Sequence, residues 1–233
     1  MFSKKLDNPD VLFSTIADGS SIMSGGFGLC GIPENSIDYL EKYGPQNLTI
    51  ISNNIGNSGR GLVKLLRKNL IKKAICSYVG GNPDLENLIL NNQIEIELIP
   101  QGSFVEKIRS AGAGIPAFYT PTGVNTLIEE TKEVRIFNGK KFLLEEALHA
   151  DFSITKATIG DEFGNLYYEG TSKNFSPLMV MAAETSIVEV QKIVAPGEIE
   201  PDLIHLPGCF VQHIYQGKNY KNHIEHLLEK GKE

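Results

Sequence analysis

Glycines crowd one short segment of the chain, residues 25–31, which reads Gly-Gly-Phe-Gly-Leu-Cys-Gly. Closely spaced glycines let a backbone approach a ligand and leave N–H groups free to donate hydrogen bonds. A helix is predicted to begin at Pro33, and its positive end would add attraction for an anion. A tight loop kept clear for packing explains the same glycines equally well. The glycine content alone therefore leaves a binding loop and a packing turn open.

This glycine loop fits neither of two common nucleotide-binding motifs. No Lys-Ser or Lys-Thr pair follows the glycines, which excludes a Walker A loop. Gly26, Gly28 and Gly31 have the spacing of a dinucleotide-binding fingerprint. That fingerprint also needs an acidic residue about twenty positions on, where Asn53 and Asn54 stand instead. We therefore do not expect a dinucleotide site.

A second candidate for chemistry is Gln101, which comes between Pro100 and Gly102 after a predicted strand. A side-chain amide at the end of a strand can point over a crevice and donate to an oxyanion. A surface turn would account for the same residues. The sequence on its own does not decide between a substrate contact and a turn.

Other reactive side chains are explained without chemistry. Cys30 has no histidine near it in the sequence to act as a base, so a small buried thiol is the simpler interpretation. His213, His223 and His226 lack the closed ligand set of a zinc site, and we expect no metal. Glu34 follows Pro33 at a helix start, where its charge complements the helix dipole.

The elements that position these residues alternate through the first half of the chain. The expected strands are residues 21–23, 48–51, 74–79 and 94–99. The expected helices are residues 33–43, 62–69, 83–90 and 104–111. This alternation predicts a parallel sheet with helices on both faces, which binds ligands beyond the carboxyl ends of its strands. Glycines or side-chain amides follow all four strands, so both candidates belong to one sheet edge.

The second half is richer in β structure. Residues 135–143 form two short β segments around Asn138-Gly139, a strong hairpin signal. Further strands are expected at residues 152–158, 166–168 and 186–194, with Gly160 and Gly164 in a loop and a helix over 177–183. No linker divides the chain. We predict one α/β domain over residues 1–233, a mostly parallel sheet flanked by helices on both faces, with a β-rich insertion after residue 115.

Composition excludes several classes of protein. The chain has 233 residues, 41% of them apolar, and a net charge of −6, which suits a folded core and argues against nucleic-acid binding. The basic cluster Arg67, Lys68, Lys72 and Lys73 is interpreted as a solvated helix end. No apolar run is long enough to span a membrane, and the N-terminus is too polar for a signal peptide. Three widely separated cysteines favour a reducing cytoplasm.

The glycine loop is part of a longer sequence pattern, which is more specific than the glycines alone. It reads Asp18-Gly19-x-x-Ile22-Met23-x-Gly25-Gly26-Phe27-x-x-x-Gly31-x-Pro33. Further matching stretches follow in order at residues 52–54, 77–80, 100–102, 112–123, 174–177 and 197–208. Together they resemble the alpha subunit of family I coenzyme A transferases over nearly the whole chain. Ser24, residues 57–61 and Asn125 depart from the family pattern, which weakens a prediction of one particular acyl substrate.

The resemblance implies an enzyme that is completed by a beta subunit, as a heterodimer or heterotetramer. It implies acyl transfer through a glutamyl-CoA thioester on that partner, with no catalytic residue on this chain. Coenzyme A would be a substrate, and no cofactor would be bound permanently. The implied coenzyme A contacts are Gly25, Gly26, Phe27, Gly28, Leu29, Cys30 and Gly31. The implied substrate-lining residues are Asn53, Asn54 and Gln101, the last as an oxyanion contact.

Several functions stay open at this point. The resemblance favours transfer of coenzyme A between succinyl-CoA and a 3-oxoacid such as acetoacetate. The alternatives are an acetate- or butyrate-type coenzyme A transferase and a non-catalytic metabolite-binding domain. A sugar-phosphate isomerase or deaminase would need a general base and phosphate-binding side chains, and neither is evident in the sequence.

Overall fold

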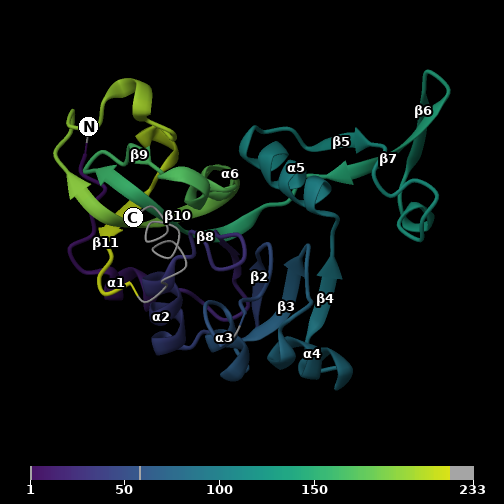
Figure 1. The fold of residues 1–233 in the computed structure, drawn as a ribbon, viewed down its shortest axis with the longest axis horizontal. Coiled ribbons are helices and arrows are strands. Elements are labelled where there is room, and N and C mark those ends of the chain that lie inside the picture. The colour runs from purple at the N-terminus through teal and green to yellow at the C-terminus, as the bar shows by residue number, and fades with distance from the viewer. Residues whose placement is uncertain (1, 58, 221–233) are drawn as a thin grey trace, which may run out of the picture.

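Seven parallel strands build the main sheet in residues 2–57 and 59–220, the part of the chain that this computed structural model describes. Their order is β11-β10-β8-β1-β2-β3-β4 (Figure 1). The strands are β1 (Ser21–Ser24), β2 (Leu48–Ile51), β3 (Ile71–Cys76), β4 (Glu95–Leu98), β8 (Ala150–Asp161), β10 (Ala183–Val194) and β11 (His213–Gln216). The short strand β9 (Leu166–Tyr167) pairs antiparallel with β8. The expected parallel sheet is confirmed.

Helices cover both faces of this sheet (Figure 1). One face carries α1 (Pro9–Phe13), α2 (Glu34–Tyr43), α3 (Val63–Arg67) and α4 (Pro83–Leu90), and the other carries α5 (Gln101–Gly112) and α6 (Ser176–Ala182). Short 3-10 helices are η1 (Glu129–Thr131), η2 (Gly170–Lys173), η3 (Pro201–Leu203) and η4 (Gly208–Phe210). The expected arrangement, with helices on both faces, is therefore correct.

Alternation along the strands explains the two layers. Successive strand residues point to opposite faces of a sheet. Ile22 of β1 belongs to the core cluster that includes Leu40 of α2, and it is fully buried. Its neighbour Met23 belongs to the opposite cluster, with Phe104 of α5 and Met179 of α6. Strand β1 thus contributes to two cores, and its end lies between the two helix layers.

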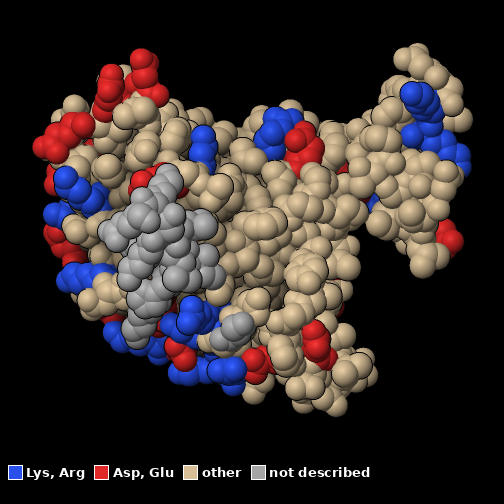
Figure 2. Space-filling view, in the orientation of Figure 1, with Lys and Arg blue, Asp and Glu red and all other residues tan. Residues whose placement is uncertain are grey.

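Residues 117–146 form a separate three-stranded antiparallel sheet, here called the arm. Its strands are β5 (Ala117–Thr120), β6 (Val134–Phe137) and β7 (Lys140–Glu146), in the order β5-β7-β6. Asn138 and Gly139 have φ angles of 50° and 74°, the left-handed values that a tight two-residue hairpin turn requires. The arm stands away from the main sheet as a lobe of its own (Figure 2). It is the predicted β-rich insertion, and the chain returns to the main sheet at β8.

One buried carboxylate ties the arm to the main body. Glu145 of β7 is only 2% exposed, and its carboxylate forms ion pairs with Lys107 of α5, at 3.1 Å, and with Lys132. Burial acts to raise the pKa of Glu145, but the ammonium groups of Lys132 and Lys107 lower that pKa below its ordinary value. The same helix α5 begins at the sheet edge, so the arm and that edge share one rigid element.

Several expected boundaries were wrong. β3 begins at Ile71 and ends at Cys76, not at residues 74 and 79, because Lys73 is a strand residue that pairs with Glu95 and Glu97 of β4. Lys72 and Lys73 therefore belong to a strand and not to a helix end. Helix α5 begins at residue 101 and not at 104. Gly160 lies inside β8, where it pairs with Ile193 of β10, and not in a loop.

Other differences are smaller. Helix α3 spans residues 63–67 and is shorter than expected. The sequence did not predict α1, β5 or β11, each of which is only four or five residues long. His223 and His226 lie outside the described residues.

Candidate functional site

A pocket of about 440 Å³ opens at the carboxyl edge of the main sheet. Every one of the strands β1 to β4 is followed by residues that line it, as expected for ligand sites on parallel sheets. The lining residues are Phe27, Gly28, Asn53, Asn54, Asn57, Ser77, Tyr78 and Gln101. The two candidates from the sequence, the glycine loop and Gln101, therefore meet in one place.

Three side chains from three strand ends form a hydrogen-bonded cluster at the base of this pocket. Nδ2 of Asn53 donates to Oε1 of Gln101 over 2.7 Å and to Oγ of Ser77 over 3.0 Å. The hydroxyl of Ser77 also lies within hydrogen-bond distance of Oε1 of Gln101. The Gln101 oxygen thus accepts from two donors. Asn54 turns differently: its Oδ1 accepts from the N–H of Gly56 and so holds its own loop.

Gln101 is the first residue of α5 and not part of a turn. Pro100 precedes it as the N-cap and provides no side-chain hydrogen bond to the helix. The first N–H groups of a helix have no partner inside the helix and carry partial positive charge. In the described part of the chain, those of Gln101, Gly102 and Ser103 have no hydrogen-bond acceptor. The start of α5 therefore offers donors where an anion would lie.

The glycine loop does not present free backbone donors, which corrects the expectation from its glycine content. The N–H of Gly25 donates to Ile154 O, that of Gly26 to Oδ1 of Asn174, and that of Gly28 to Oδ1 of Asn53. The N–H groups of Phe27 and Cys30 donate to each other's carbonyl oxygens, at 3.0 and 3.1 Å. Any contact of this loop with a ligand must then come from other atoms.

Three of the four loop glycines are required by packing. A Cβ on Gly25 would lie 2.6 Å from Oγ of Ser176, and one on Gly26 would lie 2.6 Å from the side chain of Ile32. A Cβ on Gly31 would collide with the backbone carbonyl of Ser172. Gly28 differs, because a Cβ there would meet nothing within 4 Å. Packing therefore accounts for three of the glycines, and Gly28 is the loop glycine that lines the pocket.

The remaining loop residues divide between core and pocket. Leu29 is buried, at 8% exposure, and Cys30 is half-buried with its thiol 3.6 Å from the Thr171 hydroxyl. Phe27 is 55% exposed and stands at the pocket, where its ring contacts Phe175 edge-on. On the other side, Tyr78 is 59% exposed. Two aromatic rings thus border a pocket whose base is made of amides and a hydroxyl.

Three pocket residues, Asn57, Ser77 and Tyr78, were not identified as site residues from the sequence. Ser77 and Tyr78 were taken as the interior of a strand that in fact ends at Cys76. Their signal was present, since residues 77–80 form one of the stretches that carry the family resemblance. Because the expected strand extended to residue 79, these two side chains were not recognised as following its end.

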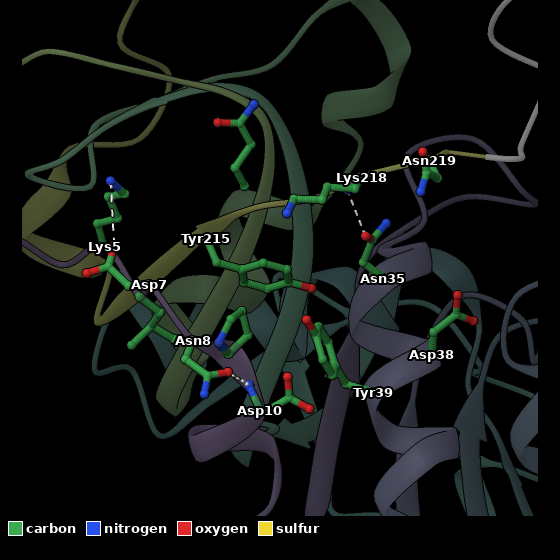
Figure 3. Close-up of a pocket in the computed structure, with 13 residues that line it drawn as sticks. Lys5, Asp7, Asn8, Asp10, Asn35, Asp38, Tyr39, Tyr215, Lys218 and Asn219 are labelled. Atoms are coloured by element: carbon green, nitrogen blue, oxygen red, sulfur yellow. Dashed lines mark hydrogen bonds and ion pairs between the residues drawn. The ribbon is translucent and has the colours of Figure 1, made fainter.

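A larger pocket of about 640 Å³ lies elsewhere, between the start of α2 and β11 (Figure 3). Its acidic side chains are paired: Asp7 with Lys5, Asp10 with Lys42 and Asp38 with Lys64. Tyr215 lines it and donates to the fully buried Glu189. The three aspartates that line this pocket are each paired with a lysine, so we assign no reaction to it.

Within residues 2–57 and 59–220, no group of three or more His, Cys, Asp and Glu side chains is arranged to hold a metal ion. His213 lies on β11, where burial and nearby Lys4 lower the pKa of its imidazole. Within the same residues, none of the helices has both the length and the apolar character needed to cross a bilayer. The three cysteines are free thiols.

Comparison with proteins of known sequence gives close relatives. Residues 7–217 match the family model for coenzyme A transferase. The chain is 50% identical over 223 residues to the A subunit of succinyl-CoA:3-ketoacid coenzyme A transferase from Helicobacter pylori strain J99, covering 96% of each chain. It is 40% identical to the human mitochondrial succinyl-CoA:3-ketoacid coenzyme A transferase 2, covering 94% of this chain and 46% of that protein.

Solved structures have the same fold. An acyl-CoA transferase (YdiF) from Escherichia coli O157:H7 superimposes with a TM-score of 0.81 at 23% identity, over 92% of this chain and 47% of that one. Glutaconate coenzyme A-transferase from Acidaminococcus fermentans superimposes with a TM-score of 0.80 at 17% identity, over 92% of this chain and 76% of that one. Together with the family match over residues 7–217, these similarities show that the chain belongs to the coenzyme A transferase family.

Proposed function

We propose that this chain is the A subunit of a succinyl-CoA:3-ketoacid coenzyme A transferase, which moves coenzyme A between succinyl-CoA and a 3-oxoacid such as acetoacetate. The relative from Helicobacter pylori carries that name and aligns along nearly its whole length. The human relative is about twice as long as the aligned region, which fits a chain that needs a second unit. That second unit would be a B, or beta, subunit, in a heterodimer or a heterotetramer.

One observation carries this proposal: the pocket has donors for an acyl oxygen, but the described residues that line it include no carboxylate to form the enzyme thioester. None of the described residues that line it has a carboxylate or a thiol. Transfer of an acyl group through an enzyme thioester needs a nucleophilic carboxylate. A glutamate of the beta subunit would attack the thioester carbon, releasing the coenzyme A thiolate and forming an acyl-glutamyl anhydride. The thiolate then attacks the glutamyl carbonyl, releases the carboxylic acid and leaves a glutamyl-CoA thioester.

This chain would stabilise the negative oxygens of those steps. Gln101, which lines the pocket, brings its side-chain amide and the start of α5 to this site. Donors aimed at a developing oxyanion, in a site that excludes water, lower the barrier to acyl transfer. Phe27 and Tyr78 would border the acyl chain or the pantetheine arm. The proposed coenzyme A contact of residues 25–31 then narrows to Phe27 and Gly28, the loop residues that line the pocket.

Coenzyme A is a substrate in this scheme, and we propose no permanently bound cofactor. The three free thiols suit a reducing compartment, so we propose that the enzyme works in the cytoplasm.

The test is reconstitution with a candidate B subunit of the same family. Three samples, the purified chain, its candidate partner and their mixture, are each incubated with succinyl-CoA and acetoacetate, and acetoacetyl-CoA is separated and quantified. We expect product only from the mixture. Turnover by this chain alone at the rate of the complex would contradict the need for a second unit. A complex that accepts acetate or butyrate but not acetoacetate would contradict the proposed substrate.

A further inference from the structure

A directed chain of hydrogen bonds runs from the glycine loop to Gln101. The N–H of Gly28 donates to Oδ1 of Asn53 over 3.3 Å, and Nδ2 of Asn54 donates to the same oxygen over 3.2 Å. Nδ2 of Asn53 in turn donates to Oε1 of Gln101 over 2.7 Å. A backbone N–H can only donate, whereas an amide side chain can present either end. The Gly28 N–H therefore fixes which atom donates and which accepts in each of the hydrogen bonds that follow.

Ser77 closes this chain from the neighbouring strand end. Its backbone N–H donates to Asn53 O over 3.2 Å, which holds the two strand ends together. Its hydroxyl accepts from Nδ2 of Asn53, and its single proton has two acceptors within reach: Oε1 of Gln101 and, over 3.1 Å, Asn53 O. Oε1 of Gln101 is the nearer of the two, and Asn53 O already accepts from the Ser77 N–H, so the proton is assigned to Gln101. Oε1 of Gln101 thus faces two donors. If the amide were rotated by half a turn, its NH2 would face Nδ2 of Asn53 instead of an acceptor.

The consequence for Gln101 is a fixed orientation. With Oε1 held by Asn53 and Ser77, Nε2 is the end of the amide left for the pocket. In the described part of the chain, Nε2 has no hydrogen-bond partner of its own. A flipped amide would present its oxygen to an acyl oxyanion and repel it, whereas the observed orientation presents two N–H donors.

We infer that Ser77, together with Asn53, is a positioning residue that holds the Gln101 amide with its NH2 toward the reacting acyl oxygen. The inference rests on the proposed function, because it needs an acyl group in this pocket. Ser77 itself need not touch the substrate. Its contribution is to remove the flipped state of Gln101, which would bind the same substrates without stabilising the negative oxygen.

The experiment is a double-mutant cycle in the reconstituted complex with its B subunit. Ser77→Ala should lower kcat by roughly fivefold to twentyfold, the effect of one hydrogen bond, with little change in the KM for succinyl-CoA. Ser77→Thr keeps the hydroxyl and should restore most of the rate. In a Gln101→Ala background, Ser77→Ala should have no further effect. Ser110→Ala is the matched control, since it removes a fully buried hydroxyl from the same helix as Gln101.

An equal loss of kcat from Ser77→Ala in both backgrounds would overturn the inference, because it would show a role independent of Gln101. A Ser77→Ala complex with the wild-type rate would overturn it as well. If the complex transfers acyl groups but not between succinyl-CoA and acetoacetate, the proposed substrate fails, and the cycle is run with the acyl pair that reacts.

A second measurement does not depend on turnover. In the complex made with amide-¹⁵N-glutamine-labelled chain, the side-chain NH2 signals of Gln101 should be sharp. Ser77→Ala should broaden or double them as the amide samples two orientations, and Ser110→Ala should not. Unchanged signals in Ser77→Ala would overturn the inference even for an inactive complex.

Discussion

Asn53 and Gln101, 48 residues apart in sequence, are joined by a 2.7 Å hydrogen bond from Nδ2 of Asn53 to Oε1 of Gln101. Asn53 follows β2 and Gln101 follows β4, with β3 between them in the sheet. The bond therefore spans two strand spacings at the carboxyl edge. It links the amide proposed to donate to the acyl oxygen with the loop that follows β2.

The first prediction concerns the Gln101 amide itself. Gln101→Ala should lower the rate of enzyme–CoA thioester formation about 10²–10³-fold, as expected for loss of one oxyanion donor. Gln101→Glu should be slower still, because its carboxylate repels both the nucleophile and the developing oxyanion. Single-turnover measurement in the reconstituted complex gives this rate, and coenzyme A affinity should change far less. Gln93→Ala, the same change at an exposed position, is the control. A wild-type rate in Gln101→Ala would show that Gln101 only begins the helix.

The second prediction separates the two kinds of glycine in the loop. Gly31 has φ 72° and no room for a Cβ, whereas Gly28 has φ 61° and open space beside it. Gly28→Ala should cost only the left-handed backbone penalty, about 1–2 kcal/mol. Gly31→Ala adds a collision with the Ser172 carbonyl and should destabilise the chain by clearly more. Urea unfolding of both variants measures the difference. Equal losses would mean that the loop adjusts freely and that packing does not explain Gly31.

Local signals in the sequence predicted the elements that need only their own residues. Gly44 directly follows the helix expected over residues 33–43; it ends α2 in the left-handed conformation and donates its N–H to Leu40 O. Asn138-Gly139 forms the hairpin turn of the arm for the same reason. Such signals depend only on residues within one turn of backbone. They can therefore be recognised without knowing how the strands are ordered in the sheet.

The functional site could not be predicted from local sequence signals alone. The glycines of residues 25–31 indicated free N–H donors, but Asn174, Asn53 and Ile154 accept from them, and these residues arrive from distant segments. Ser77 was missed because basic Lys73 was taken as solvated, which moved the expected start and end of β3 three residues along. Strand order in the sheet decides both points, and no short pattern encodes it.

The third prediction tests the attachment of the arm. Glu145→Ala removes the acceptor shared by Lys107 and Lys132, at a cost of about 2 kcal/mol, since both lysines can still reach water. The loss should be local. Backbone amides of β7 should exchange hydrogen faster, while those of β1 and β2 should not. Glu146→Ala is the matched control, because Glu146 is the exposed neighbour on the same strand. If the β7 amides of Glu145→Ala exchange as slowly as those of the wild type, apolar packing alone holds the arm.

The last prediction is a pH dependence that arises at Glu189. This carboxyl group is fully buried in β10, and burial raises its pKa from 4.5 to about 7, although hydrogen bonds from Ser36 and Tyr215 oppose the rise. Between those two values the folded chain keeps a proton that the unfolded chain has released. The contribution of Glu189 to the free energy of unfolding must therefore fall as pH rises from about 4.5 to 7, and level off above that. The total is of the order of 3 kcal/mol, at about 1.4 kcal/mol for each pH unit.

Glu189→Gln has no proton to lose, so its stability relative to wild type should rise by roughly that amount across this range, measured by urea unfolding at several pH values. Glu184→Gln, an exposed change on the same strand, should show no such trend. A constant difference between Glu189→Gln and wild type at all pH values would mean that Glu189 titrates as an ordinary carboxyl group.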